Sequence, residues 1–172
     1  DGRVLLWDLQ TGWLLRTLVS NGGPQRSVAV GRNGTILVVG SGSGALTAYD
    51  LIENKELRWW GAHDGMINGL AFSPDGKLLA SVSTDRSIKL WAGGAGDWER
   101  VASAKPFGTG LNSVWFMDER RLVVGGVSFL PGAAGGIQPV ETDTVAVLDV
   151  PKLRAGQVAG GARLPVADWK NK

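Results

Sequence analysis

The sequence predicts an all-β fold made of repeated antiparallel units of four short strands. Three observations support this prediction. Glycine makes up 26 of the 172 residues, about twice its usual share of about 7 %, as expected for a chain with many tight turns. Short apolar runs with alternating polarity lie between these turns, a pattern typical of strands. The chain also resembles itself at a spacing of about 42 residues, which indicates a repeat architecture.

The repeat appears when the chain is shifted by about 42 residues against itself. The shift places Trp7 on Tyr49, and Tyr49 on Trp91. A fourth copy follows at a slightly longer spacing and places Phe72 on Phe116. Because four aligned copies share one strand-like pattern, we expect the copies to adopt the same local structure.

The fourth copy contains an insertion. Leu78 aligns with Leu122, but the position of Trp91 is not reached again until Leu148. The extra residues, at about 128–141, are rich in glycine and proline. A loop of this length is either a tolerated surface segment or a recognition loop, and the sequence does not decide between the two.

The third copy shows the elements of one unit most clearly. It predicts a first strand from Ile67 to Phe72, a second from Leu78 to Ser83, a third from Ser87 to Trp91 and a fourth from Trp98 to Ser103. The turn 73–76 contains Pro-Asp-Gly, in which proline presets φ and glycine accepts a positive φ. Four such strands, named a to d in chain order, form one blade of a β-propeller, whose repeats have a period of this length.

We therefore expect a β-propeller segment of about four four-stranded antiparallel blades. Propellers usually have about four to eight blades, and the chain enters in the middle of a blade, so we expect neighbouring blades that are missing from this chain. The expected boundaries are 1–20 for the end of a first blade (strands c and d), 21–60 for a second, 61–104 for a third, 105–160 for a fourth with the insertion in its b–c loop, and 161–172 for a tail or the start of a further blade.

The third copy resembles the WD40 repeat along the whole blade. The histidine of the family's glycine–histidine pair is His63 here, and the tryptophan of its tryptophan–aspartate pair is Trp91. The first copy contains that pair itself as Trp7-Asp8. The resemblance covers roughly residues 1–150 and implies a propeller that binds other proteins.

The resemblance also implies a hydrogen-bonded network inside the third blade. Its members here would be His63, Ser81 or Ser83, Asp85 and Trp91. The chemistry is consistent, because a buried imidazole needs partners at both ring nitrogens and an indole N–H needs an acceptor. We therefore expect His63, the single histidine of the chain, to be structural and not a catalytic base or metal ligand.

The blade topology also predicts which end of the molecule is functional. In an antiparallel blade the b–c turn and the d–a connection lie at the same end, so His63, Asp85 and the insertion mark one edge, called the top edge below. We expect a protein or peptide partner to dock there. The candidate residues lie on inner strands, beside the Asp85 turn or in the insertion: Met66, Asn68, Thr84, Arg86, Trp115, Phe129 and Leu130.

Two further patterns have a structural interpretation. The run Gly40–Gly44 resembles a phosphate-binding loop in composition, but it leads into another strand and not into a helix, so it predicts a hairpin turn. The pair Trp59-Trp60 could anchor a partner. We expect core positions for both, because both faces of a blade pack against neighbouring blades.

The function predicted is a protein-interaction scaffold within a larger multidomain protein. The alternative is a propeller enzyme, such as a hydrolase or a quinone-cofactor dehydrogenase, with its site in the central mouth. The predicted inner strands offer amides and hydroxyls but no acid, histidine or lysine, which is unfavourable for catalysis. We therefore predict no enzyme activity, no catalytic residue, no cofactor and no metal site.

Composition argues against other classes of partner. The net charge is +2 and the basic residues are scattered, whereas nucleic-acid binding needs a basic stripe. The chain has no stretch of about 18 apolar residues, so no membrane span is predicted. The absence of cysteine excludes disulfides and zinc–thiolate sites. It fits a reducing compartment such as the cytoplasm, which we favour, and also a bacterial periplasm.

Overall fold

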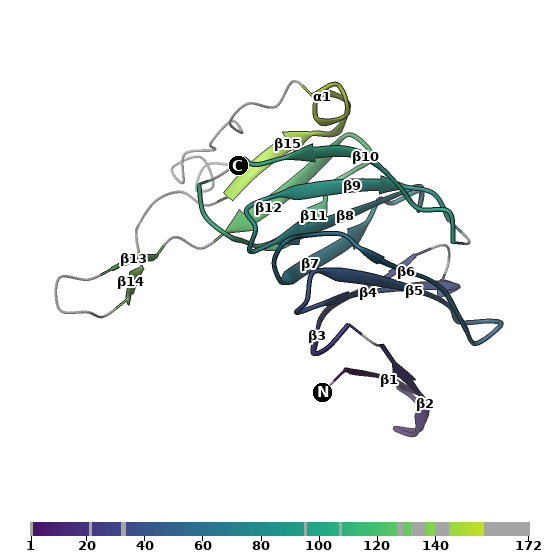
Figure 1. The fold of residues 1–172 in the computed structure, drawn as a ribbon. Helices are drawn as coiled ribbons and strands as arrows, with labels where there is room; N and C mark the ends of the chain where they lie inside the picture. The colour runs from purple at the N-terminus through teal and green to yellow at the C-terminus, as the bar shows by residue number, and fades with distance from the viewer. Residues whose placement is uncertain are drawn as a thin grey trace.

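The structure, a computed structural model, describes residues 2–20, 22–31, 34–94, 96–106, 108–126, 129–131, 137–139 and 145–156, with the backbone alone for 129–131 and 137–139. All strand pairs in this part of the chain are antiparallel. The N-terminal sheet lies at the bottom of Figure 1, and the larger sheets that follow it lie above. The predicted all-β architecture of antiparallel blades is confirmed.

Two sheets have four strands each, and both have their strands in sequence order. We call them blade 2 and blade 3, and the shorter sheets before and after them blade 1 and blade 4. Blade 1 comprises β1 (Arg3–Trp7) and β2 (Leu14–Val19); blade 2 comprises β3 (Gln25–Gly31), β4 (Ile36–Ser41), β5 (Ala45–Asp50) and β6 (Lys55–Gly61); blade 3 comprises β7 (Ile67–Phe72), β8 (Leu78–Ser83), β9 (Ile88–Ala92) and β10 (Glu99–Ala104); blade 4 comprises β11 (Leu111–Phe116), β12 (Arg121–Gly126) and β15 (Val145–Asp149).

The strands form where the turn chemistry separates them. In blade 3 the hydroxyl of Ser73 accepts a hydrogen bond from the backbone N–H of Leu78 at 2.9 Å, and Gly76 adopts a φ of 69°. This turn joins β7 and β8 as the Pro-Asp-Gly sequence predicts. The Gly40–Gly44 run forms the hairpin between β4 and β5, so that prediction is also confirmed.

Three apolar layers hold the blades together. One lies between blades 1 and 2, one between blades 2 and 3, and one between blades 3 and 4. The middle layer contains the stacked pair Trp60 and Trp98, with ring centroids 6.4 Å apart, and Trp91 packs against Trp60 at 5.8 Å. Each layer removes large apolar surfaces from water, which is the main favourable contribution to the stacking.

Trp59 does not follow the expectation of a core position. Trp60 is 8 % exposed, whereas Trp59 is 52 % exposed. Successive side chains of a strand point to opposite faces, and in the outermost strand β6 the face that carries Trp59 is not fully covered. The tryptophan pair is therefore half core and half surface.

The alignment of the fourth copy shifts by one residue at its a–b turn. Phe72 pairs with Leu79, and Phe116 pairs with Leu122. The structural equivalent of Leu122 is therefore Leu79, and the predicted match with Leu78 is wrong. The a–b turn of blade 4 is one residue shorter, which a gap-free shift cannot reveal.

After β15 the chain forms the short helix α1 (Val150–Arg154). Asp149 caps the helix by accepting a hydrogen bond from the N–H of Lys152 at 3.0 Å. Pro151 lies in the first turn, where its missing N–H costs no hydrogen bond. Val150 and Leu153 are buried in the layer between blades 3 and 4. The strand expected near residues 156–158 and the tail 161–172 lie almost wholly outside the described residues.

The inner strands show one repeated position that differs in blade 4. Ala29 and Ala71 face the following blade and pack in the apolar layers on that side. The same position in blade 4 is Trp115, which is 71 % exposed. Val145 on β15 is 46 % exposed. This face of blade 4 is thus open and apolar among the described residues.

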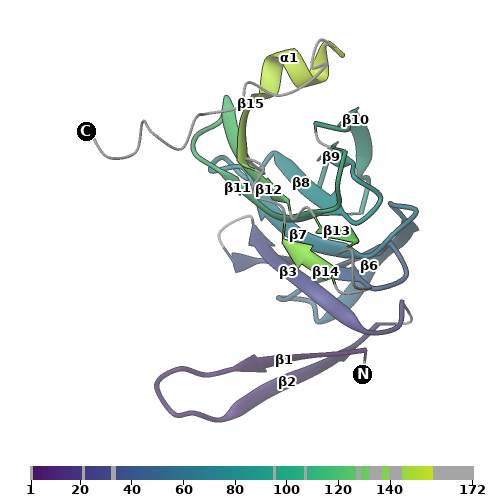
Figure 2. The ribbon, with the colours of Figure 1, turned by 90° about the vertical axis from the view of Figure 1, so that its left-hand side faces the viewer.

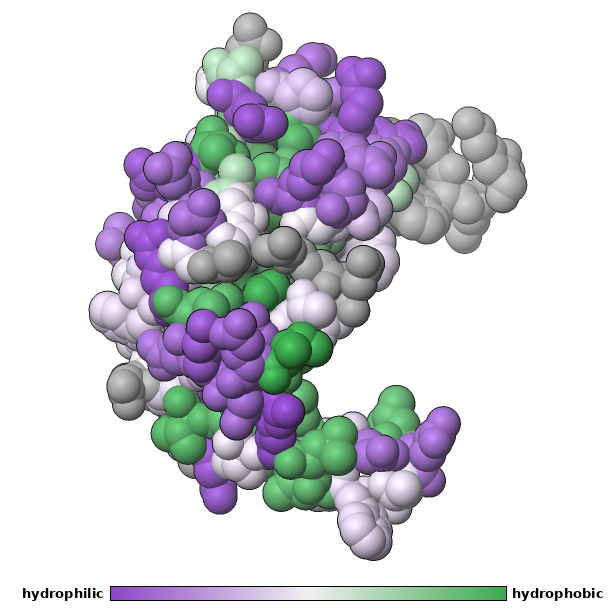
Figure 3. Space-filling model, turned by 90° about the vertical axis from the view of Figure 1, so that its right-hand side faces the viewer, coloured by the Kyte–Doolittle hydropathy of each residue, from purple (hydrophilic) through white to green (hydrophobic). Residues whose placement is uncertain are grey.

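A second open surface lies at the other end of the stack. Val28 and Val30 on β3 face blade 1, yet they are 53 % and 54 % exposed, because the described part of blade 1 has two strands and leaves them uncovered. Leu5 and Trp7 are also about half exposed, on the outer face of blade 1. Figure 2 shows the β1–β2 hairpin extending away from blade 2, and Figure 3 shows hydrophobic residues on the lower sheets beside a hollow.

Candidate functional site

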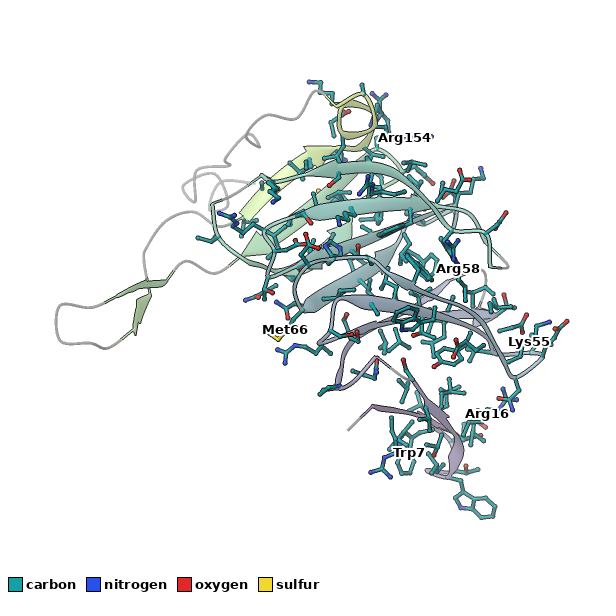
Figure 4. All side chains as sticks on the ribbon, viewed as in Figure 1. Trp7, Arg16, Lys55, Arg58, Met66 and Arg154 are labelled. Carbon is teal, nitrogen blue, oxygen red and sulfur yellow. The ribbon has the colours of Figure 1, made fainter. Side chains whose placement is uncertain are left out.

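The top edge is built from the b–c turns and the d–a connections, as the topology requires. His63, in the connection between β6 and β7, lies with its Nδ1 atom 2.9 Å from Oδ2 of Asp85 in the β8–β9 turn. The backbone of Met66 and Thr84 is also joined, by a hydrogen bond of 3.0 Å. In Figure 4 Met66 marks this edge, and Lys55, in the region of a c–d turn, marks the opposite edge.

His63 connects the turn to the interior of blade 3. Its Nε2 atom lies 2.8 Å from the hydroxyl of Ser81, and the indole N–H of Trp91 donates to the same hydroxyl at 2.8 Å. Its Nδ1 atom also lies 3.0 Å from the hydroxyl of Ser87. His63, Ser81, Asp85 and Trp91 are therefore in one continuous hydrogen-bonded cluster.

Ser83 has a different place. Its hydroxyl accepts a hydrogen bond from the backbone N–H of Asp85 at 3.1 Å. Ser87 instead contacts the imidazole and donates to Oδ1 of Asp85 at 2.6 Å. Ser83 thus stabilises the turn, and Ser87 belongs to the cluster although the sequence reasoning did not include it.

The environment sets the charge of the two ionisable members. Burial lowers the pKa of His63 below its ordinary value of 6.5, and the nearby Asp85 carboxylate only partly opposes this effect. Burial alone would raise the pKa of Asp85, but hydrogen bonds from Ser87 and His63 hold it well below its ordinary value. The cluster therefore contains a neutral imidazole beside an ionised carboxylate.

The top edge is also tied to the neighbouring blade. The backbone N–H groups of Ala62 and His63 both donate to the carbonyl of Gly44 at 2.9 Å. Gly44 has a φ of 85°, and a Cβ atom there would lie 2.2 Å from the carbonyl oxygen of His63. Only glycine allows this approach, so the β4–β5 turn of blade 2 holds the connection that carries His63.

Three of the predicted partner-binding residues are brought together at this edge. Met66 is 39 % exposed, and Thr84 and Arg86 are also exposed. The hydroxyl of Thr84 accepts from the N–H of Met66 at 3.0 Å. Arg86 has a φ of 73° in the β8–β9 turn. The result is a small surface with one flexible apolar group, one hydroxyl and one cation on a rigid turn.

Asn68 lies on the inner edge and is already hydrogen-bonded on both sides. Its Oδ1 atom accepts from Nε of Arg26 at 3.2 Å, and its Nδ2 atom donates to Oδ1 of Asn112 and to the carbonyl of Leu111, both at 3.0 Å. Sequence reasoning did not identify Arg26 or Asn112. The repeat spacing could have found them, since both align with Asn68.

The remaining predicted residues lie on blade 4 and in its insertion, and of these Trp115 is not brought to this surface. Trp115 pairs with Val123 near the end of β11 that is farther from the top edge. Its side chain lies on the open face of blade 4. Phe129 and Leu130 belong to β13 (Phe129–Pro131), which pairs with β14 (Ile137–Pro139) as a short hairpin in the insertion. Their side chains lie outside the described part of the structure.

The insertion leaves blade 4 at the top edge. A Cβ atom at Gly126, the last residue of β12, would lie 2.8 Å from the carbonyl oxygen of Gly110. A Cβ atom at Gly110 would in turn lie 3.3 Å from Cα of Thr84. The end of β12 is therefore next to the β8–β9 turn that carries Asp85.

Other kinds of site are not found in the described residues. No group of three or more histidine and acidic side chains in this part of the chain is placed to hold a metal ion. Among its helices, none has the length and apolar character needed to cross a bilayer.

Comparisons with known proteins agree with the geometry. Residues 54–92 match the family model described as "WD domain, G-beta repeat". The chain is 33 % identical over 92 residues to APC/C activator protein CDC20 of Saccharomyces cerevisiae, covering 53 % of this chain and 15 % of that protein. It is 34 % identical over 96 residues to WD repeat and SOCS box-containing protein 1 of Mus musculus, covering 53 % of this chain and 22 % of that protein.

Solved structures show the same fold. The structure of U3-55K superposes with a TM-score of 0.73 at 20 % identity, covering 89 % of this chain and 44 % of that one. The crystal structure of the RRP9 WD40 repeats gives a TM-score of 0.66 at 19 % identity, covering 87 % and 44 %. The chain thus spans less than half the length of these proteins.

Proposed function

Because this chain belongs to the WD40-repeat proteins, we propose that it is a protein-interaction scaffold whose partner, a protein or peptide segment, docks on the top edge. The observation that carries the proposal is the exposed group Met66, Thr84 and Arg86, held on turns that are anchored to the buried cluster of His63. Binding residues are commonly found on loops that a rigid scaffold positions.

The character of this surface supports a protein partner. Methionine adapts its shape to an apolar contact, and arginine makes forked hydrogen bonds, so both suit an interface. The adjacent insertion at 128–141 would extend the surface, with Phe129 and Leu130 as further apolar contacts. Two relatives support the proposal by their names, since one is an activator protein of APC/C and the other combines WD repeats with a SOCS box.

The enzyme alternative has less support. The inner edge near the top carries Asn68, which is hydrogen-bonded to Arg26 on one side and to Asn112 on the other. A general base, a nucleophile and an oxyanion donor in mutual contact would be needed for hydrolysis, and the described inner strands offer no such set.

The test is an affinity capture with the purified chain as bait. The double variant Met66→Glu with Arg86→Asn changes the proposed surface, and asparagine suits the positive φ at Arg86. The matched control, Ile52→Glu with Arg120→Asn, makes the same changes at exposed positions in turns of the opposite edge. We expect proteins captured by the wild type and the control to be lost with the top-edge variant.

A third variant lacking residues 128–141 tests the insertion separately. Loss of the same captured proteins would assign the insertion to the interface. If the top-edge variant captures the same proteins as the control, the partner uses another surface and the proposal is wrong.

A further inference from the structure

Three side chains at equivalent positions form a chain of hydrogen bonds along the inner edge of the blades. Arg26, Asn68 and Asn112 each occupy the one residue that is skipped where the first strand of a blade pairs with the second. A β-bulge of this kind redirects a side chain out of the regular alternation. Because the bulge recurs in blades 2, 3 and 4, the three redirected side chains meet.

The orientation of both amides in this ladder is fixed by chemistry. Arg26 can only donate, so the atom of Asn68 at 3.2 Å from its Nε must be the amide oxygen. The carbonyl of Leu111 can only accept, so the atom of Asn68 at 3.0 Å from it must be the amide nitrogen. The same nitrogen then requires the oxygen of Asn112.

These bonds therefore occupy the amide oxygens of Asn68 and Asn112 and leave N–H donors of Arg26 available. Within the described residues, Nε of Arg26 is hydrogen-bonded to Asn68, while its two Nη atoms have no protein partner. Arg16 and Arg58 differ, since an Nη atom of each donates to a backbone carbonyl. Arg121 differs too, because it forms an ion pair with Asp118.

Arg26 is also placed at the top edge. Its side chain is exposed, and its stem lies over the β4–β5 turn, since a Cβ atom at Gly42 would be 3.8 Å from Cδ of Arg26. The bond from Nε to Asn68 restrains the guanidinium and leaves its two Nη atoms available to a ligand. A planar fork of two N–H donors matches the two oxygens of a carboxylate.

We propose that the guanidinium of Arg26 binds a carboxylate of the docked segment, so that the partner of the top edge is a peptide that presents a carboxylate. The inference rests on the proposed function and adds the chemical class of the partner. An aspartate or glutamate side chain and a C-terminal carboxylate share this chemistry, and Arg26 would bind either through the same two N–H groups.

The test uses NMR spectra of the ¹⁵N-labelled chain in which the side-chain signals of Arg26 and Asn68 are assigned. Three N-acetylated peptides serve as probes: acetyl-Gly-Glu-Gly-amide with a side-chain carboxylate, acetyl-Gly-Gly-Gly with a free C-terminus, and acetyl-Gly-Gln-Gly-amide with neither. We expect a carboxylate probe to shift the Nε–H signal of Arg26 saturably and the Asn68 amide with it. The peptide that gives the tighter binding identifies the source of the carboxylate.

Matched variants separate this site from general attraction between charges. Arg26→Gln should weaken binding of the carboxylate probe at least about fivefold, and Arg26→Lys should restore only part of it because lysine lacks the fork. Asn68→Ala should weaken it while leaving the charge in place. Arg120→Gln, at the opposite edge, should have no effect.

Each contrary outcome has a distinct meaning. Equal shifts at Arg26 and Arg120, or equal shifts with the glutamine peptide, would overturn the proposal. Capture that is lost with the Met66 and Arg86 variant but retained with Arg26→Gln would leave the proposed function standing and remove this inference. Capture retained by both variants would remove the proposed function itself.

Discussion

The proton on the His63 ring has one consistent position at neutral pH. The ionised Asp85 carboxylate can only accept, so the ring proton is on Nδ1, which faces it. Nε2 then accepts the proton of the Ser81 hydroxyl, and that hydroxyl accepts from the indole N–H of Trp91. A second proton on the ring would sit on Nε2, where it would displace the hydrogen bond that the Ser81 hydroxyl donates.

Lowering the pH should therefore destabilise the chain. The pKa of His63 is lower in the folded state than its ordinary value of 6.5 because the ring is buried. The unfolded state thus binds a proton first, so the stabilisation is complete above about pH 6.5 and decreases as the pH falls towards the lower pKa of the folded state. The slope is at most about 1.4 kcal/mol per pH unit for one group.

Urea unfolding at pH 7.5 and pH 5.5 measures this effect. His63 is the single histidine of the chain, so the variant His63→Gln should be less stable at both values but should show a much smaller difference between them. An equal difference in wild type and variant would contradict the assignment to His63.

Trp91 contributes by packing as well as by its hydrogen bond. It is 6 % exposed and contacts Trp60. Trp91→Ala should reduce the free energy of unfolding by about 3–5 kcal/mol through the cavity it leaves. Trp91→Phe should cost about 1–2 kcal/mol, mainly from the loss of the bond to Ser81. Trp13→Ala, at a site 76 % exposed, should change stability by less than about 0.5 kcal/mol. Chemical denaturation compares the three.

For the single residues of the His63 cluster, the sequence predicted the residue types but not every contact. Ser81 and Ser83 lie two positions apart, so they face the same side of a strand, and periodicity cannot choose between them. Only the register of β8 against β9 shows that Ser81 reaches the imidazole. Ser87 was expected to begin the third strand and was not assigned to the network, whereas the structure places it just before β9, where its hydroxyl reaches the imidazole.

Among the elements, the β4–β5 turn is the most constrained by its neighbour. Gly44 combines a positive φ with a close approach to His63, whereas Gly12 has a similar φ of 71° and a Cβ atom there would have no atom within 4 Å. Gly12→Ala should therefore cost about 1 kcal/mol for the backbone conformation alone. Gly44→Ala should cost more than about 2 kcal/mol, because the connection carrying His63 must also move.

Thermal unfolding of the two glycine variants provides the comparison. If both lose the same stability, the close approach at Gly44 is relieved without cost and the coupling between blades 2 and 3 at this point is weak. A larger loss for Gly44→Ala together with a shifted His63 signal in NMR spectra would support the coupling.

The elements of blades 2 and 3 could be predicted because turn residues and alternation agree there. The prediction failed where tertiary packing decides. Trp59 and Trp60 look alike in sequence, yet only the stacking of Trp60 on Trp98 buries one of them. Likewise, Val150 and Leu153 are apolar in either a strand or a helix, and the cap at Asp149 with Pro151 favours the helix.

In the whole molecule the stacking leaves apolar surface at both ends. Trp115 is 71 % exposed on blade 4, and Val28 and Val30 are more than half exposed on blade 2. Such faces are covered between blades 2 and 3. Large exposed apolar patches favour association, so the isolated chain should self-associate as its concentration rises.

Sedimentation velocity over a range of concentrations tests this expectation. Trp115→Gln should reduce the association, because it removes the largest exposed apolar group of the blade 4 face. Leu9→Gln, at a turn residue 97 % exposed, should leave it unchanged. A wild-type chain that stays monomeric at all concentrations would show that these faces do not drive association.

The residues at one repeated position, Ala29, Ala71 and Trp115, determine which blades can be duplicated within such a chain. Blades 2 and 3 each present a small residue to the blade that follows, in apolar layers to which the following blades contribute the equivalent bulky residues Phe72 and Phe116. A duplicated copy of blade 3 could therefore be inserted beside the original with matching faces. Blade 4 lacks this interchangeability, since its tryptophan would meet those bulky residues, and it can only be followed by a unit shaped to receive it.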